Sequence, residues 1–212
     1  MALAAAPDRD RALENYGRLA AGYDATCGNI IAVREAALAA LAVQEGETVF
    51  DVACGTGWTL ERLARAVGPS GTALGIELCP SMADIARGRL AASGLAATFA
   101  VGSVDTLDTS HRADAMLFCY THDVLQTPGA VERLIRHAKP GCRIAVAGIR
   151  FLPWSWGFAI NAVTAWRTRH YITTYRGLSR PWAGLAAACS EFRIVRHFHL
   201  GSSYLATGRL RG

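Results

Sequence analysis

Five apolar runs alternate with helical segments through the middle of the chain, and this alternation constrains the fold more than any other feature. Helices are expected near 57–67, 80–92 and 129–138, where Lys139-Pro140-Gly141 would end the last one. Continuous apolar strands separated by helices predict a parallel sheet that is covered on both faces. The apolar runs are TVFDVA (48–53), TALGIEL (72–78), ATFAV (97–101), DAMLFCY (114–120) and RIAVAGI (143–149).

Helices are also expected on both sides of this alternation. Residues 8–23 are predicted to form an amphipathic helix, because one helical face carries Leu13, Tyr16, Ala20 and Tyr23. A second helix, rich in Ala and Leu, is expected near 30–42. Beyond Pro153 the pattern predicts a long aromatic helix over 154–175 and a short helix that starts at Pro181.

The chain ends in two strand-like runs, 192–200 and 202–210, which are separated only by Gly201. One residue is too short for a crossover helix, so the two strands must be antiparallel. The predicted fold class is therefore α/β: a doubly wound, Rossmann-like three-layer sandwich with a seven-stranded, mostly parallel sheet and an antiparallel C-terminal pair. With 212 residues we expect a single domain, 1–212, with N-terminal lid helices over 1–45 and a helical cap over 150–190.

Charge is unevenly divided along the chain. From Lys139 to the end there are eleven Lys and Arg residues against one acidic residue, Glu191, whereas the first 138 residues carry eleven basic and sixteen acidic residues. The net charge is thus +10 in the last part and −5 before it. Such a separation favours contact between the C-terminal part and something anionic, although a solvated face of arginines over apolar surface would look the same.

Six widely spaced cysteines include no Cys-x-x-Cys pair, so neither a metal site nor a disulfide scaffold is expected, and a reducing compartment is favoured. No apolar run reaches the roughly 18 residues of a spanning helix, and charged residues at 8–11 interrupt any signal-like segment. We expect a cytoplasmic protein, with peripheral contact at the inner face of the membrane left open.

The loop after the first apolar run holds the strongest chemical signal. Gly55 and Gly57 follow a buried strand and precede a helix, so ligand atoms can approach backbone N–H groups there. No Gly-Lys-Ser/Thr follows, and Leu60 occupies the position where a dinucleotide fingerprint has glycine. Glu77, at the end of the next strand, can accept both ribose hydroxyls. Asp51 would repel a pyrophosphate but suits a positively charged nucleoside such as S-adenosylmethionine.

Through these residues and several further segments, the sequence resembles the class I S-adenosylmethionine-dependent methyltransferases, including small-molecule, quinone and phospholipid methyltransferases. The matching segments, in the family's order, are Asp51 to Gly57, GIELCPSM (75–82), VGSVD (101–105), ADAMLFCY (113–120), KPGCRIAV (139–146) and the closing strand pair. The resemblance implies S-adenosyl-L-methionine as the cofactor and S-adenosyl-L-homocysteine as the product.

The family's contacts carry over residue by residue as expectations. Two positions depart from the family pattern: Ala53 replaces the first glycine of the loop, and Ser103 replaces an aspartate at the adenine. The cofactor contacts that the resemblance implies are Tyr16 and Tyr23 in a lid, Asp51, Ala53, Gly55 and Gly57 around the methionine portion, Glu77 at the ribose, Leu78 and Met82 on the adenine, Ser103 and Val104 at its edge, and the Cys119 carbonyl at the ammonium.

Catalytic candidates follow the fourth strand, because ligands gather at the carboxyl ends of strands near the switch point. His122 is either a proton acceptor near neutral pH or a structural hydrogen bonder, and Tyr120 is the second candidate. Asp123 is predicted to cap a helix from Val124 onward rather than to orient His122. His197 and His199 are interpreted as structural.

The aromatic segment after Pro153 is predicted to form the substrate wall, through Trp154, Trp156, Arg167 and Tyr171. Aromatic rings with guanidiniums suit a flat or lipid-like molecule that carries a carboxylate or phosphate, although many of these rings could instead be helix-packing core. The predicted function is transfer of a methyl group to N, O or C of a small anionic or aromatic metabolite. The alternative is a membrane-associated phospholipid or quinone methyltransferase. No nucleic-acid partner is expected, and a homodimer is left open.

Overall fold

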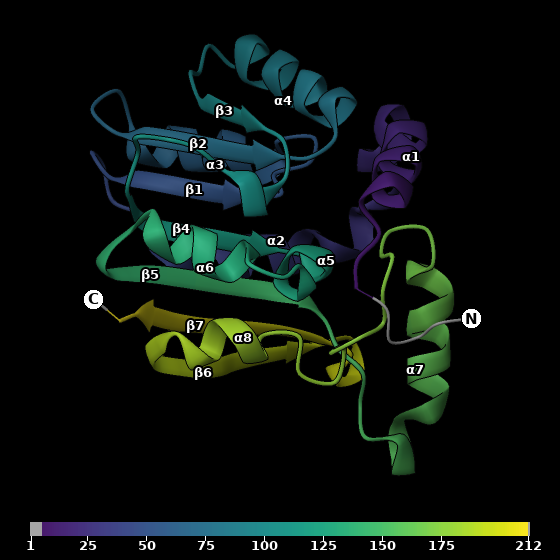
Figure 1. The fold of residues 1–212 in the computed structure, drawn as a ribbon. Coiled ribbons are helices and arrows are strands. Elements are labelled where there is room, and N and C mark those ends of the chain that lie inside the picture. The colour runs from purple at the N-terminus through teal and green to yellow at the C-terminus, as the bar shows by residue number, and fades with distance from the viewer. Residues whose placement is uncertain (1–5, 212) are drawn as a thin grey trace.

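The computed structural model describes residues 6–211, and its centre is one seven-stranded sheet in the order β3-β2-β1-β4-β5-β7-β6 (Figure 1). Neighbouring strands from β1 to β5 pair in parallel, whereas β7 is antiparallel to both β5 and β6. The predicted fold class is confirmed. The strands are β1 (Thr48–Val52), β2 (Thr72–Glu77), β3 (Thr98–Val101), β4 (Ala113–Cys119), β5 (Ala138–Ile149), β6 (Cys189–Phe198) and β7 (Ser203–Leu210).

Helices cover both faces of the sheet because successive strand residues point to opposite faces. Val49 packs with α2, α3 and α4 on one face, whereas Phe50 packs with α5, α6 and α8 on the other. These helices are α2 (Ile31–Leu41), α3 (Trp58–Val67), α4 (Pro80–Ala92), α5 (His122–Gln126), α6 (Ala130–Arg136) and α8 (Ala183–Ala187).

The strand order reverses between β1 and β4, which places a crevice beyond their carboxyl ends. Figure 1 shows α1 (Arg9–Leu19), α5 and α7 (Trp154–Thr168) gathered at this end of the sheet. Four short 3₁₀ segments complete the described chain: η1 (Ala20–Thr26), η2 (Gly28–Ile30), η3 (Val104–Thr106) and η4 (His199–Gly201). Residues 1–5 and 212, which the predicted domain includes, lie outside the described residues.

Two predicted helices end earlier than expected. The N-terminal α-helix stops at Leu19, and η1 continues the predicted span 8–23 as a tighter turn. The aromatic helix stops at Thr168 instead of residue 175. There the backbone N–H and hydroxyl of Thr173 donate to Asp123 Oδ2, at 2.9 and 2.7 Å, and this long-range contact draws the chain away from the helix axis.

The segment after α6, where the sequence predicted a helix stop at residues 139–141, also differs from expectation. Lys139-Pro140-Gly141 does not form a separate turn but lies within β5, where the register with β4 shifts between Ala113 and Ala115. A bulge accommodates the proline, which cannot donate to the ladder. Within residues 6–211, no helix is long and apolar enough to cross a membrane.

Candidate functional site

The loop between β1 and α3 has a left-handed backbone at three positions. Ala53, Gly55 and Gly57 have φ angles of 54°, 56° and 78°. A side chain at Gly57 would place its Cβ 2.7 Å from Ala86 Cβ, so α4 can approach this loop only because residue 57 is glycine. A Cβ at Gly55 would meet no atom within 4 Å. Gly57 therefore serves packing, whereas Gly55 faces open space.

Ala53, which replaces the first glycine of the family's loop, has an unusual backbone conformation. Its positive φ is a conformation that L-residues with a side chain rarely adopt and that costs about 1 kcal/mol or more. The neighbouring Cys54 N–H donates to the carbonyl of Ile76 at 3.0 Å, which ties the loop to β2. The loop therefore keeps the shape of a glycine turn although its first residue is alanine.

Glu77 ends β2 beside this loop, and only 7% of it is exposed. Its two carboxylate oxygens accept the backbone N–H groups of Gly55 and Cys79, each at 2.8 Å. Burial raises the pKa of Glu77, and these N–H groups act in the opposite direction. Each oxygen retains a lone pair, so the carboxylate is held in place with capacity for further donors.

Asp51 lies beneath the loop rather than in the wall of a cavity. Thr59 Oγ1 donates to Asp51 Oδ2 at 2.7 Å, and only 1% of Asp51 is exposed. Burial raises the pKa of Asp51 to about 7, whereas the Thr59 hydrogen bond and the charge of Arg34 act to lower it. Asp51 and Glu77 are thus two buried carboxylates near the crevice. Their hydrogen bonds and neighbouring charges do not fully offset the cost of burying a negative charge.

Arg34 is a site residue that the sequence analysis missed. It is buried on α2, where its guanidinium donates to Cys27 Sγ at 3.6 Å and lies 5.7 Å from the Trp58 ring centroid. The available signal was its spacing, because Arg34 shares a helical face with the core residues Ala37 and Leu41. A buried arginine with so few partners is expected to bind an anionic group.

A cavity of about 110 Å³ joins these groups. Several predicted cofactor residues line it, but Asp51, Gly57, Ser103 and Val104 do not. Val104 is buried in the sheet core, and the Ser103 hydroxyl donates to Asp105 instead. The predicted residues that line the cavity are Tyr16, Tyr23, Ala53, Gly55, Glu77, Leu78, Met82, Cys119, Tyr120, His122 and Tyr171.

The predicted lid residues cover this cavity. Tyr16 donates its hydroxyl to the Tyr171 carbonyl at 2.7 Å, and the ring of Tyr23 lies edge-on to both tyrosines, at 6.1 and 6.0 Å. Asp24 pairs with Arg89 of α4 and accepts from Thr56 Oγ1 at 2.6 Å. The N-terminal segment is therefore attached both to the loop side and to the segment after α7.

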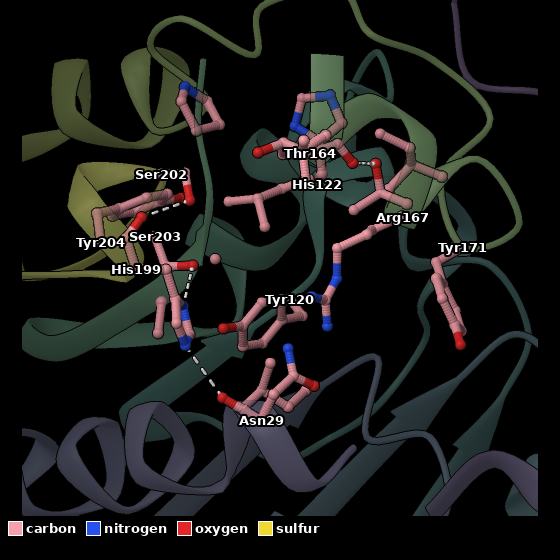
Figure 2. Close-up of a pocket in the computed structure, with 18 of the residues that line it drawn as sticks. Asn29, Tyr120, His122, Thr164, Arg167, Tyr171, His199, Ser202, Ser203 and Tyr204 are labelled. Carbon is pink, nitrogen blue, oxygen red and sulfur yellow. Dashed lines mark hydrogen bonds between the residues drawn. The ribbon is translucent and has the colours of Figure 1, made fainter. Parts of the chain in front are cut away.

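A second cavity, of about 770 Å³, opens beside the first and shares its walls at Tyr16, Tyr23, residues 120–122, Tyr171 and Ile172. Most of its wall is apolar, and β5, α7 and the β6–β7 turn contribute about half of the lining residues. Figure 2 shows the guanidinium of Arg167 reaching into this cavity toward Tyr120. None of the described residues that line it is acidic.

His199, which the sequence analysis treated as structural, also lines the large cavity. Its ring nitrogens lie 2.9 Å from Ser203 Oγ and 3.1 Å from the Asn29 carbonyl, as the dashed lines in Figure 2 show. His199 therefore has the structural contacts that were expected and a place at the wall that was not. Trp154 and Trp156 differ from expectation, because they line neither cavity and are 66% and 61% exposed.

Four consecutive residues after β4 carry buried polar atoms that have no hydrogen-bond partner among the described residues. These atoms are Tyr120 Oη, Thr121 Oγ1, both ring nitrogens of His122 and Asp123 Oδ1. Tyr120 also has a φ of 61°, a strained backbone for a bulky residue. Buried polar atoms are normally paired, so this cluster, where the two cavities meet, is a candidate ligand contact.

Burial sets the protonation states of this cluster. It lowers the pKa of His122 to about 4, while nearby backbone groups of Arg176 and Thr174 act in the opposite direction. It raises the pKa of the Tyr120 phenol. At neutral pH His122 is therefore an uncharged imidazole and Tyr120 a protonated donor.

The predicted capping role of Asp123 is wrong. The helix α5 begins one residue earlier, at His122, so Asp123 lies inside its first turn. Asp123 Oδ2 accepts both the backbone N–H and the hydroxyl of Thr173, as described above. Asp123 therefore holds the segment after α7 against α5, which brings the cap over the site.

Comparison with known proteins indicates the enzyme class. Residues 49–141 match the model of a methyltransferase domain family. This match supports a class I S-adenosylmethionine-dependent methyltransferase. The predicted enzyme class and the predicted cofactor, S-adenosylmethionine, are confirmed.

Solved structures share the fold of this methyltransferase over nearly its whole length. The Haloferax volcanii protein solved with the Trm112 methyltransferase activator is 18% identical, with a TM-score of 0.72 and coverage of 95% of this chain and 98% of that one. The N-methyltransferase NodS from Bradyrhizobium japonicum WM9, solved with S-adenosyl-L-homocysteine, is 16% identical, with a TM-score of 0.68 and coverage of 96% and 100%. A methyltransferase from Aquifex aeolicus is 18% identical, with a TM-score of 0.55 and coverage of 96% and 97%.

The residues of the small cavity fit this cofactor. Glu77 offers free lone pairs to ribose hydroxyls, and the space beside Gly55 leaves room for ligand atoms. Burial raises the pKa of Glu77, so a positively charged ligand beside it would stabilise its carboxylate. Arg34 could hold a carboxylate. This set of partners suits a nucleoside with an amino-acid tail and a positive charge.

Proposed function

We propose that this methyltransferase moves a methyl group to an apolar acceptor that carries an anionic group and lies in the large cavity. The cluster of unpaired polar atoms at residues 120–123 carries the proposal, because it lies where the two cavities share their walls. A bound acceptor would provide the missing hydrogen-bond partners.

The cavity lining supports this acceptor class. Its apolar wall suits a hydrophobic or aromatic body, and its volume of about 770 Å³ accommodates a molecule larger than an amino acid. Arg167 and Arg169 are the basic side chains of the lining, and no acidic residue among the described lining residues offsets them. An anionic group of the acceptor would therefore be favoured near Arg167, which can bind a carboxylate or phosphate through two parallel hydrogen bonds.

The small cavity is proposed to hold the cofactor through residues that the family resemblance suggested, together with Arg34. Glu77 would accept the ribose hydroxyls, Leu78 and Met82 would pack against the adenine, and Arg34 would bind the carboxylate of the methionine portion. Tyr16 and Tyr23 would cover the ligand from the lid. S-adenosylmethionine supplies a methyl carbon that its sulfonium group activates for displacement.

The protein's own contribution to the reaction is then mainly alignment. We propose that Tyr120 donates a hydrogen bond to the acceptor and that neutral His122 accepts one from its N–H or O–H group. A histidine with a pKa near 4 is a weak base, so positioning is favoured over full proton removal before the methyl group moves. Residues 150–190 are proposed to act as the cap that encloses the acceptor.

An assay of S-adenosylhomocysteine release tests the proposal. The acceptor panel would keep one ring system and vary its substituent between a carboxylate, a neutral amide and an amine. We expect turnover with the carboxylate and at least about tenfold lower kcat/KM for the amide, since one charged hydrogen-bonded contact contributes about 1.5–3 kcal/mol. A preference for the amine, or equal rates for all three, would contradict the proposed acceptor class.

A further inference from the structure

The helix α7 is turned so that its aromatic side chains face outward. Its inward side consists of the small or polar residues Gly157, Asn161 and Thr164, which are buried. Its outward side carries what we call the aromatic face: Trp154, Trp156, Phe158, Val163 and Trp166, which are 56–66% exposed. An apolar surface of this kind is unusual on an isolated soluble protein and marks an interaction site.

Specific contacts fix this orientation. The Asn161 side chain accepts the Leu152 N–H at 2.8 Å and donates to the Leu152 carbonyl at 2.9 Å. A Cβ at Gly157 would lie 2.4 Å from Leu152 Cβ, so only glycine allows the helix to pack this closely. Rotating the aromatic face inward would break both contacts. Its exposure is therefore a property of the fold, and Figure 1 shows α7 at the outer edge of the molecule.

The sequence around the aromatic face is basic. No acidic residue occurs between Glu132 and Glu191 in the sequence. Arg167 and Arg169 lie at the C-terminal end of α7, and Arg176 and Arg180 follow in the exposed segment after it. Exposed Trp and Phe side chains next to Arg are typical of helices that lie in the plane of a membrane interface.

We propose that the aromatic face of α7 docks on the surface of an anionic lipid bilayer. The large cavity distinguishes a bilayer from a protein partner. Val163, Trp166 and Leu200 line this cavity and are also 56%, 65% and 83% exposed, so its apolar mouth opens on the same side. A protein that covered the face would close the mouth, whereas a lipid surface leaves a continuous apolar path into it.

Docking itself does not depend on the proposed acceptor. A second statement, that the acceptor enters the cavity from the bilayer, rests on the proposed function. The two statements are tested by different measurements on the same protein: vesicle binding without any turnover, and S-adenosylhomocysteine binding by calorimetry. Calorimetry reports whether the methyltransferase site is intact in each variant.

The experiment measures co-sedimentation of the full chain with phosphatidylcholine vesicles that contain or lack phosphatidylglycerol. The test variant combines Trp154→Ser, Trp156→Ser and Phe158→Ser, none of which lines a cavity. The matched control combines Ile194→Ser and Val195→Ser, which are exposed on β6. We expect binding to the anionic vesicles at low salt, at least about tenfold weaker binding for the test variant, and little change for the control.

A charge variant supplies a second readout. The substitutions Arg176→Gln and Arg180→Gln each remove a positive charge. Each should weaken vesicle binding by about fivefold if the arginine lies near the lipid surface, and 0.5 M salt should make the loss caused by each substitution smaller. S-adenosylhomocysteine affinity should not change in any of these variants.

Three outcomes would overturn the docking proposal. The first is no sedimentation with anionic vesicles at low salt by protein that still binds S-adenosylhomocysteine. The second is equal vesicle binding by the test variant and the parent. The third is sedimentation equilibrium that shows a dimer in the parent and a monomer in the test variant, which would make the aromatic face an interface between two copies of the chain.

Discussion

The two cavities of this methyltransferase are built in contrasting ways. The small one, of about 110 Å³, is formed by strand ends, a glycine loop and buried carboxylates, so backbone geometry determines its shape. The large one, of about 770 Å³, is lined by side chains from many elements, among them β5, α7 and the β6–β7 turn. We therefore expect the proposed cofactor side to tolerate few changes, whereas the proposed acceptor side can change its chemistry one side chain at a time.

The two regions also differ in the charge of the side chains that they contain. Buried carboxylates with raised pKa values lie on the proposed cofactor side, whereas arginines line the proposed acceptor side, where none of the described lining residues is acidic. The first suits a positively charged ligand, and the second suits an anionic one. The unpaired atoms of residues 120–123 lie between the carboxylates and the arginines, where the two cavities share their walls. Substitutions on each side should therefore affect different ligands.

The largest effect is expected for Glu77→Ala on the cofactor side. The substitution leaves the N–H groups of Gly55 and Cys79 without their acceptor and removes the proposed ribose contact. Since each charged hydrogen bond contributes about 1.5–3 kcal/mol, S-adenosylhomocysteine affinity should fall by about a thousandfold in calorimetry. Glu132→Ala, an exposed acid on α6, is the control and should bind normally. Unchanged affinity of Glu77→Ala would remove Glu77 from the site.

The pH dependence of the free energy of unfolding tests the junction between the two cavities, where His122 lies. The pKa of His122 is lowered from 6.5 to about 4, so the folded chain holds this ring neutral where the unfolded chain binds a proton. Stability should therefore fall as pH decreases from about 6.5 to 4, by about 3 kcal/mol in total from this residue. His122→Asn should lose that part of the slope in urea unfolding measured across this range, and His170→Asn, at an exposed position, should keep it.

His122→Asn also separates the two ligands. Turnover should fall by more than cofactor affinity, because His122 is proposed to contact the acceptor. Full turnover with a flattened stability profile would make this histidine structural.

A smaller effect separates the two glycines of the loop. Gly57→Ala should lower the free energy of unfolding by about 2 kcal/mol, because its Cβ would lie 2.7 Å from Ala86 Cβ on a backbone with φ of 78°. Gly55→Ala should lower it by about 1 kcal/mol, since only the φ of 56° is unfavourable, but should weaken cofactor binding. Equal stabilities of the two variants would contradict the packing role assigned to Gly57.

The smallest effect is expected on the acceptor side. Arg167→Met should raise the KM for an anionic acceptor by about tenfold, which corresponds to about 1.4 kcal/mol, and leave S-adenosylhomocysteine affinity unchanged. Arg180→Met, which lines neither cavity, is the control. A loss of cofactor affinity in Arg167→Met would show that the two cavities do not bind separate ligands.

The sequence predicted the small cavity better than the large one, because the small cavity depends more on local sequence patterns. Gly55, Gly57 and Glu77 were found because they follow strands, and strands are recognised from local apolar runs. The small cavity is largely built from such local signals. Arg34 was missed because its role depends on how α2 packs beside the loop, a long-range contact that helical periodicity alone presents as part of a core face.

The acceptor side could be predicted less well for a related reason. Trp154 and Trp156 were expected in the substrate wall because the segment after Pro153 combines aromatic rings with arginines, but the contacts of Asn161 and Gly157 with Leu152 turn α7 the other way. The end of α7 and the role of Asp123 both depend on the Asp123–Thr173 hydrogen bonds, which join residues 50 positions apart. No local pattern contains that information.

One calorimetric experiment tests the central claim that separate cavities bind the cofactor and the acceptor. S-adenosylhomocysteine would be titrated into the parent, Glu77→Ala and Arg167→Met, with NAD titrated into the parent for comparison. We predict one-to-one binding that Glu77→Ala abolishes and Arg167→Met leaves unchanged, and no heat from NAD. Binding of NAD without binding of S-adenosylhomocysteine, or equal losses in the two variants, would contradict the claim.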